Sequence, residues 1–389
     1  MQIRLLSGQE RALAEDLWDY CFEKRGTPFF DWYFSKYCRT GNILGAFAQE
    51  KLAGMVHLNP YALLMNGETI PVSYLVGVAV APEFRRQGLF RDMLAESFSE
   101  LNRRGQPLTI LKPTAAGLYT RYGFACCYYR LNYSLPFDGL LKLPYSGKYE
   151  FAAVRDSDWP CLQAVYSGFT AGYNGQVRRS ETQWLNMLGE SAHKGAGRAV
   201  LARAGGQARG YLFYTLSEDC FRVAEMAYLD NAAKLALLSF AAQHFSQCAN
   251  FSWLAPADDL TFLEFARDNH YPVYQPFMIG RIINPPEAVA RLKLPSPPSA
   301  VNIALTDGII AENNAVFKLS GAHGAARLDR TEEAPRVRLG IGALAQLCFG
   351  AHSPDSLLAA GCLETADQAA LACLRAVFAV KTNYINEYF

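Results

Sequence analysis

The residues of this sequence that are best suited to chemistry form a short basic turn, Arg-Arg-Gln-Gly-Leu-Phe, at positions 85–90. An apolar, β-branched run before it predicts a buried strand over residues 74–80, which Pro82 ends. The apolar spacing that follows predicts a helix over residues 89–103. The first N–H groups of such a helix can bind phosphate, and the two arginines add positive charge there. Gly88 lets the backbone approach a ligand closely, so the pattern predicts a diphosphate site.

An ordinary strand-to-helix connection with a solvated basic face is the alternative interpretation of this turn. The turn matches neither the P-loop pattern G-x-x-x-x-G-K-[ST] nor the dinucleotide pattern G-x-G-x-x-G. Its chemistry therefore depends on the elements that hold it.

The chain around the turn predicts a mixed sheet with helices. The predicted elements are helices at 10–24 and 28–38 and strands at 42–49, 51–64, 67–80, 108–112 and 125–135. Asn66-Gly67 predicts a hairpin turn between two of the strands. The second helix is crowded with aromatic side chains, among them Trp32, which either belong to the core or form one wall of an acceptor pocket.

The same order of elements begins again, more weakly, after residue 149. The predictions are helices at 156–169, 180–188, 232–248 and 258–269 and strands at 199–204, 210–216, 221–229 and 250–255. The corresponding turn, residues 227–236, lacks the paired arginines and the glycine. Prolines at 285–286 and 295–298 mark a further boundary, followed by alternating strands and three helices. We predict domains at 1–140, 141–285 and 286–389.

Composition limits the classes of partner. The 389 residues suffice for two or three globular domains, and a net charge of +1 gives no reason to expect nucleic acid or an anionic membrane. The N-terminus lacks the apolar core of a signal peptide, and no run of 18 apolar residues occurs. Ten cysteines without C-x-x-C pairs favour reduced thiols, and the six histidines have no metal-binding spacing. We expect a cytoplasmic protein with no metal.

The turn and four other segments carry a resemblance to a known family. Val78, Val80, Pro82, Arg85, Arg86, Gly88 and Leu89 resemble the acetyl-CoA motif of the GNAT superfamily of N-acetyltransferases. The segment LYTRYGF, the pattern Leu305, Asp307, Ile309 and Asn313, the segment GIGALAQLCFG from Gly340 and the aromatic C-terminus resemble the Eis-type acetyltransferases. The resemblance implies an α+β (mixed α/β) fold: two tandem GNAT domains, the second without cofactor, and a sterol-carrier-protein-like domain.

The resemblance also implies the ligands and the assembly. Acetyl-CoA would contact Val78, Ala79, Val80, Arg85, Arg86, Gln87, Gly88, Leu89, Phe90 and Thr114. The acceptor would be a small-molecule amine, such as an aminoglycoside or polyamine, or a protein lysine. The chains of this family assemble as homo-oligomers, commonly hexamers.

Acetyl transfer to an amine needs a neutral nucleophile, a donor for the oxyanion and a proton for the leaving thiolate. A backbone N–H near Val78 or Ala79 could serve the oxyanion, and pantetheine amides could bond to the strand edge if the strands splay there. By its place in LYTRYGF, Tyr119 is the expected acid, with Tyr122 as the substitute. The family implies that the carboxylate of Phe389 is the base, and the apolar end of the chain is expected to dock.

Three points stay open at this stage. Trp32 and Tyr388 are expected in the substrate pocket, but its carboxylates are not placed and the acceptor is not identified. The alternative function is a hydrophobic-ligand or lipid carrier with the GNAT domains as scaffold. A module that binds CoA without turnover is the third reading.

Overall fold

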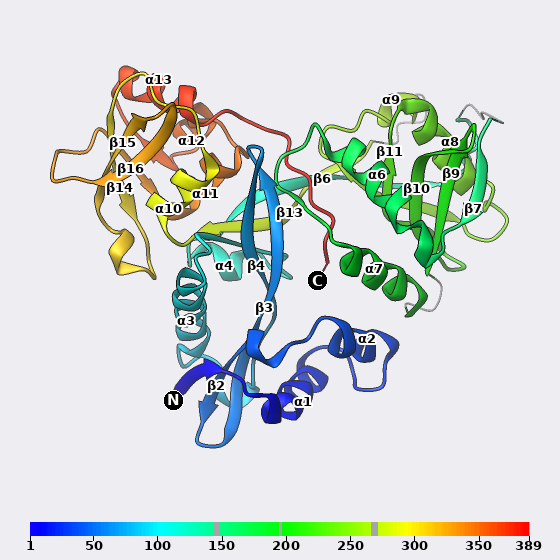
Figure 1. Ribbon diagram of the computed structural model, residues 1–389, viewed down its shortest axis with the longest axis horizontal. Helices are drawn as coiled ribbons and strands as arrows, with labels where there is room; N and C mark the ends of the chain where they lie inside the picture. The colour runs from blue at the N-terminus through cyan, green and yellow to red at the C-terminus, as the bar shows by residue number, and fades with distance from the viewer. Residues whose placement is uncertain (144–147, 194–196, 266–270, 389) are drawn as a thin grey trace.

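The computed structural model describes residues 1–143, 148–193, 197–265 and 271–388. Its described strands form one 13-stranded sheet, shared by two units of the chain, and a 5-stranded sheet in a third unit. Figure 1 shows the first unit in blue and cyan, the second in green and the third in yellow to red. The mixed α/β architecture is the predicted one.

The first unit follows the predicted order closely. Its elements are β1 (Gln2–Leu5), α1 (Arg11–Cys21), α2 (Pro28–Lys36), β2 (Ile43–Ala48), β3 (Lys51–Met65), β4 (Glu68–Val80), α3 (Leu89–Arg103), β5 (Leu108–Leu111), α4 (Gly117–Thr120), β6 (Ala125–Pro136) and α5 (Phe137–Leu140). Asn66 and Gly67 have φ of 52° and 82°, the left-handed values that a tight hairpin between β3 and β4 requires. The apolar side of α3, with Met93 and Phe98 buried, packs on the sheet.

The second unit repeats this order. Its elements are β7 (Glu150–Ala153), α6 (Trp159–Thr170), β8 (Gln176–Val177), α7 (Glu181–His193), β9 (Gly197–Ala204), β10 (Gln207–Leu216), β11 (Cys220–Tyr228), α8 (Asn231–Ala242), β12 (Asn250–Pro256), α9 (Phe262–Phe265) and β13 (Val273–Ile282). The prediction of a helix to residue 248 is wrong, because N–H groups from Gln243 onward bond three residues back in tight turns. The helix predicted at 258–269 is described only as α9, and 266–270 lie outside the described residues.

Strands β6 and β13 are exchanged between the two units. The strand order through the centre of the sheet is β4-β5-β13-β6-β12-β11. Strand β13 of the second unit pairs antiparallel with β5 of the first, and β6 of the first unit pairs antiparallel with β12 of the second. The two units are therefore halves of one continuous sheet. Strand β13 was not predicted from the sequence, because it contains Pro276, which has no N–H to donate to a strand ladder.

The third unit is an α+β layer. Its elements are α10 (Pro285–Leu292), β14 (Val301–Thr306), β15 (Val316–Ala322), β16 (Ala325–Arg330), β17 (Val337–Gly340), α11 (Ile341–Phe349), α12 (Pro354–Ala359), β18 (Leu363–Glu364) and α13 (Gln368–Val377). A fully buried ion pair of 2.8 Å between Arg281 and Asp307 ties it to β13. The connection between β14 and β15 contains the turn-forming pairs Asp307-Gly308 and Asn313-Asn314.

Strands β4 and β5 diverge at a fork. Their parallel ladder, whose residues are all described, consists of the single pair Tyr74–Ile110, although β4 continues to Val80. Beyond Tyr74 the edge of β4 that faces β5 has backbone groups available to a ligand. The strand splay that the sequence argument required is therefore present.

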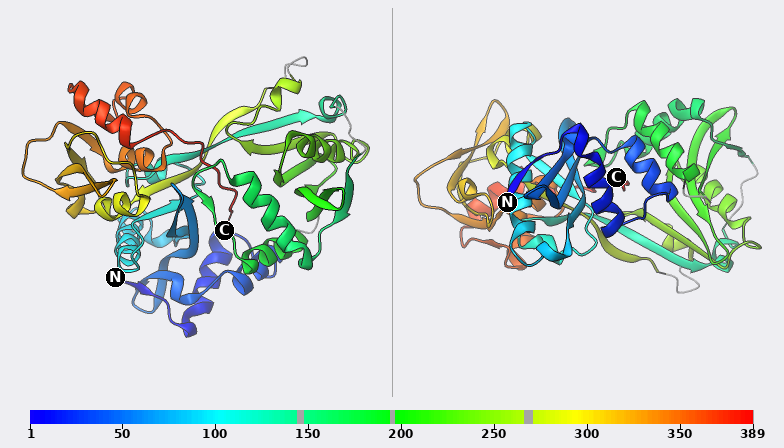
Figure 2. Two further views of the ribbon diagram at one scale, coloured as in Figure 1. Left: turned by 45° about the horizontal axis from the view of Figure 1, so that its top comes forward. Right: turned by 90° about the horizontal axis from the view of Figure 1, so that it is seen from below.

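The tail, residues 379–388, leaves the third unit and runs between the other two. Both Figure 1 and Figure 2 show its end between the first unit and α7. Backbone hydrogen bonds hold it at Gly350 and Asn174, and the side chains of Tyr384 and Ile385 are buried. The predicted docking of the chain end is present through Tyr388, the last described residue.

Candidate functional site

The basic turn, residues 85–90, includes a helix start that carries no side-chain cap. Gly88 is the N-cap of α3 and has φ of 86°, while Arg86 takes a left-handed φ of 62°. The first N–H groups of α3 lack intrahelical partners, as at every helix start. The side chains of Arg85, Arg86 and Gln87 are exposed around them. This combination of free N–H groups and cations suits a diphosphate.

The carboxylate of Glu83, shortly before the basic turn, is neutralised by a nearby lysine. Glu83 forms an ion pair with Lys51 from the start of β3, and this contact lowers the pKa of the Glu83 carboxyl. Arg85 donates to the carbonyl of Val80 at 2.9 Å, which holds the turn against the end of β4. Glu83 therefore adds little negative charge where the phosphates would lie.

A β-bulge in β4 lies just beyond the fork. The β3–β4 register passes from His57–Val76 to Met55–Ala79, so that Gly77 and Val78 face no direct partner. Gly77 has φ of 56°, and a Cβ there would lie 2.5 Å from the Trp18 ring. Glycine is needed both for the bulge and for this contact with α1. The bulge lies at the residues expected to serve the oxyanion.

Tyr119 lies on the single turn of α4, close to the start of α3. Its ring contacts the rings of Phe90 and Phe124, with centroids 5.5 and 5.7 Å apart. Tyr119 is buried in a hydrophobic cluster that also contains Leu111 of β5. Val78 of β4 packs against this cluster. Burial raises the pKa of its hydroxyl to about 12, so the group holds its proton at neutral pH. Tyr122 contacts Phe90 from another side. Thr114 is exposed in the loop between β5 and α4.

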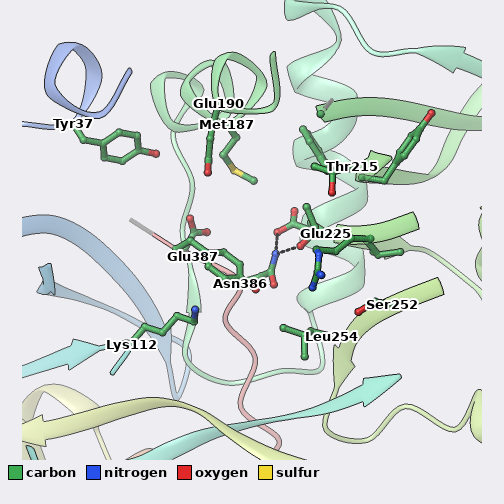
Figure 3. A pocket seen from close by; sticks show the side chains of 17 residues that line it. Tyr37, Lys112, Met187, Glu190, Thr215, Glu225, Ser252, Leu254, Asn386 and Glu387 are labelled. Carbon is green, nitrogen blue, oxygen red and sulfur yellow. Dashed lines mark hydrogen bonds between the residues drawn. The ribbon is translucent and has the colours of Figure 1, made fainter. Parts of the chain in front are cut away.

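A cavity of about 490 Å³ lies where the first unit, the second unit and the tail meet (Figure 3). The first unit contributes Tyr37 and Lys112, and the tail contributes residues 386–388. Most of the remaining wall comes from α7, β10, β11 and β12. The hydroxyl of Tyr74 at the fork donates to the carbonyl of Tyr388 at 3.2 Å. The cavity and the fork therefore share the end of the tail.

Three carboxylates line this cavity, and none of them was predicted from the sequence. They are Glu190 of α7, Glu225 of β11 and Glu387 of the tail. Arg179 donates to both oxygens of Glu225 at 2.6 Å and to Glu387 at 2.7 Å. An acid inside the apolar strand VAEMA was the available signal for Glu225.

Burial and pairing act oppositely on two of these acids. Burial alone would raise the pKa of Glu225, but the ion pair with Arg179 outweighs it and the pKa is lowered. For Glu387 burial dominates over the attraction of Arg179, and the pKa is raised. One buried cation thus faces two carboxylates, which favours a further cation in the cavity.

The other expected pocket residues divide between the wall and the layer behind it. Tyr388 lines the cavity, its ring 4.5 Å below the Lys112 ammonium group and 5.8 Å from the Phe277 ring. Trp32 is 2% exposed and lies behind α7, with its indole N–H donating to Asn186 at 3.2 Å. Phe389, the expected base, lies outside the described residues.

The described residues of the second unit include no comparable phosphate turn. Asp230 caps α8 by accepting the N–H of Ala233 at 2.8 Å and forms an ion pair with Arg209. A carboxylate at a helix start would repel phosphate, and it takes up an N–H that a ligand would need. Within the described ranges, no cluster of acidic, histidine or cysteine side chains is arranged to hold a metal, and no helix is long and apolar enough to cross a membrane.

Comparison with known families covers all three units. Residues 2–127 and residues 175–282 match two families, each described as an acetyltransferase (GNAT) domain. Residues 285–386 match a family described as a sterol carrier protein domain.

Relatives align with most of the chain. The N-acetyltransferase Eis of Mycobacterium tuberculosis is 24% identical over 359 residues, which cover 86% of this chain and 85% of the relative. An uncharacterised N-acetyltransferase of Streptomyces coelicolor is 23% identical over 331 residues, or 79% of this chain and 78% of that protein. A GCN5-related N-acetyltransferase from Anabaena variabilis has the same fold, with a TM-score of 0.85, 19% identity and full coverage of both chains. Eis1 from Mycobacterium abscessus superposes with a TM-score of 0.77 and 18% identity, again over both whole chains.

Proposed function

Because the chain belongs to the Eis-type family of GNAT N-acetyltransferases, we propose that it transfers the acetyl group of acetyl-CoA to a primary amine bound beside the tail. One observation supports this proposal: Tyr74 at the fork is hydrogen-bonded to the tail that borders a carboxylate-lined cavity, and its strand, β4, leads into the uncapped start of α3. Donor and acceptor would approach the fork from these two sides. Since Asp230 occupies the matching turn of the second unit, each chain has one donor site.

The donor is bound through its diphosphate and its pantetheine arm. The N–H groups of residues 87–90 and the two arginines take the diphosphate. The open edge of β4 beyond Tyr74 takes the pantetheine amides as an added strand would. The bulge at Gly77 and Val78 turns a backbone N–H toward the thioester oxygen.

The reaction forms the C–N bond first and then breaks the C–S bond. The neutral amine attacks the thioester carbon, and the oxyanion is stabilised by the N–H of Val78 or Ala79. When the intermediate collapses, Tyr119 gives its proton to the leaving thiolate, which it can do because its pKa of about 12 keeps it protonated until then. The proton lost by the amine passes to the terminal carboxylate of Phe389, directly or through water.

The role of Phe389 is supported by how the tail is held. Tyr388, its neighbour, is bonded to Tyr74 at the fork, and residues 384–387 are buried. The described tail is therefore held at the fork, where donor and acceptor would meet, as far as Tyr388. A carboxylate can act as a base when its surroundings raise its pKa.

The acceptor is an amine that carries more than one positive charge. Glu190, Glu225 and Glu387 line the cavity together with the cations Lys112 and Arg222, and Arg179 pairs with Glu225 and Glu387. An ammonium group bound among these acids would orient a second, neutral amine toward the thioester. Polyamines, aminoglycosides and lysine side chains with basic neighbours fit this description.

The test is a thiol-release assay with acetyl-CoA and a panel of mono- and polyamines. We expect turnover with polyamines, and loss of turnover when one residue is added after Phe389, with acetyl-CoA affinity near normal. An active extended enzyme would rule out the terminal carboxylate as base. Native mass spectrometry separates the enzyme, which retains CoA, from a lipid carrier, which would retain lipid instead.

A further inference from the structure

The second unit contains its own fork, at the position that matches the donor fork of the first. Strands β11 and β12 are parallel and joined through α8, as β4 and β5 are joined through α3. Their ladder ends at the pair Val223–Trp253, although β11 continues to Tyr228. The β10–β11 register shifts at Ala224, so this strand also carries a bulge just beyond its fork. Since no phosphate turn accompanies this fork, its use differs from that of the first.

The tail occupies the second fork. The side-chain amide of Asn386 donates to the carbonyl of Ala224 at 3.0 Å and to the carboxylate of Glu225 at 2.9 Å (Figure 3). The side-chain oxygen of Asn386 accepts from the buried guanidinium of Arg130. The bulged strand thus binds a side-chain amide of the tail through hydrogen bonds, as a binding site would hold a ligand.

A buried ion triplet fixes the next residue. The side chains of Arg179, Glu225 and Glu387 are 0%, 2% and 6% exposed. Arg179 and Glu225 belong to the second unit, and Glu387 belongs to the tail. Hydrogen-bonded charges at this depth are costly to leave unpaired, so the triplet specifies one position for the tail. Beyond Glu387 the tail reaches Tyr388, which Tyr74 holds at the first fork.

We propose that the second GNAT unit is a receptor for the C-terminal segment of its own chain. Asn386, Glu225 and Arg179 are positioning residues that set where the chain end meets the donor fork. The unit has lost the phosphate turn and uses the opening between its strands to hold a peptide. This inference rests on the proposed function only in assigning a catalytic purpose to the position of the tail.

The test uses the full-length enzyme with Asn386→Leu, which removes both the donor and the acceptor at similar volume. Hydrogen–deuterium exchange of residues 380–388 measures the docking, and kcat and acetyl-CoA affinity measure catalysis. We expect protection of the tail and kcat each to fall by about tenfold or more, while acetyl-CoA affinity stays within about twofold. As a control, Asn250→Ala removes a side-chain amide of the same unit that donates to the backbone carbonyl of Asp219. It should change neither the protection of the tail nor kcat.

Exchange elsewhere in the second unit guards against a merely unstable variant. Strands β9 and β10, which pair with each other, should keep wild-type protection in Asn386→Leu. Unchanged protection of residues 380–388 in Asn386→Leu, or a loss of protection that spreads to β9 and β10, overturns the receptor. Lost protection with a normal kcat upholds the receptor and instead overturns the terminal carboxylate as base.

Discussion

The hydroxyl of Tyr74 donates to the backbone carbonyl of Tyr388 at 3.2 Å, and Tyr74 is also the residue of β4 that pairs with β5. The end of the described tail is therefore fixed at the fork itself. Tyr74→Phe should lower kcat by about tenfold and leave the KM for acetyl-CoA unchanged, because only the tail is released. Tyr133→Phe is the matched control, since that buried hydroxyl donates to the Asp259 carboxylate at 2.8 Å and its ring packs in a cluster built from β6 and the second unit. Equal effects of the two substitutions on kcat would contradict this assignment.

The basic turn should account for most of the donor affinity. Arg86→Gln removes one cation from the start of α3, and we expect the Kd for acetyl-CoA to rise by about tenfold at low salt and less at high salt. Isothermal titration at two salt concentrations measures this. Arg209→Gln changes the corresponding turn of the second unit, where Asp230 stands, and should leave the Kd unchanged. A comparable loss in both variants would mean that the second unit also binds donor.

Tyr119 should govern the chemical step. Tyr119→Phe removes the proton donor but keeps the ring contacts with Phe90 and Phe124, so we expect kcat to fall by about a hundredfold with little change in folding. Because the pKa of Tyr119 is raised to about 12, the wild-type pH profile should show no fall from its ionisation up to pH ~10. Tyr122→Phe is the control and should retain activity. A single-turnover measurement separates these effects from product release.

Gly77 should be intolerant of any side chain. Gly77→Ala requires a positive φ of an L residue, which costs about 1 kcal/mol, and drives a methyl group into Trp18, which costs about 1–3 kcal/mol more. Gly67→Ala has the same backbone cost, with φ of 82°, but nothing lies within 4 Å of the added Cβ. The unfolding midpoint should therefore fall further for Gly77→Ala. Equal unfolding midpoints for the two variants would contradict the close contact between Gly77 and Trp18.

Glu387 should make stability depend on pH. Its pKa in the folded protein is raised by burial, so the folded state holds the proton more tightly than the unfolded chain. This contribution is present below the pKa of the unfolded chain, about 4.3, and is lost as the pH rises through the higher folded value. Relative to the wild type, Glu387→Gln should gain thermal stability as the pH rises across that window. A constant difference in unfolding temperature would contradict the raised pKa.

Local patterns in the sequence predicted the helix and strand around the basic turn well. The bounds of α3 agree with the expected 89–103, because the glycine N-cap and the apolar spacing both lie within a few residues. The acceptor side depends on contacts between distant positions, such as Arg179 with Glu225 and Glu387, and no local pattern specifies them. Strand β13 was missed for a similar reason, since Pro276 hides a strand whose partners lie in the other unit.

The exchange of β6 and β13 has a consequence for biosynthesis. The ribosome releases β5 and β6 well before β13, which must enter between them. The first unit therefore cannot close its sheet during translation as an independent domain would. The tail that borders the cavity lies still further along the chain than β13. A nascent chain from which β13 has not yet emerged therefore lacks the strand that fills the space between β5 and β6, and its cavity lacks the wall that the tail supplies.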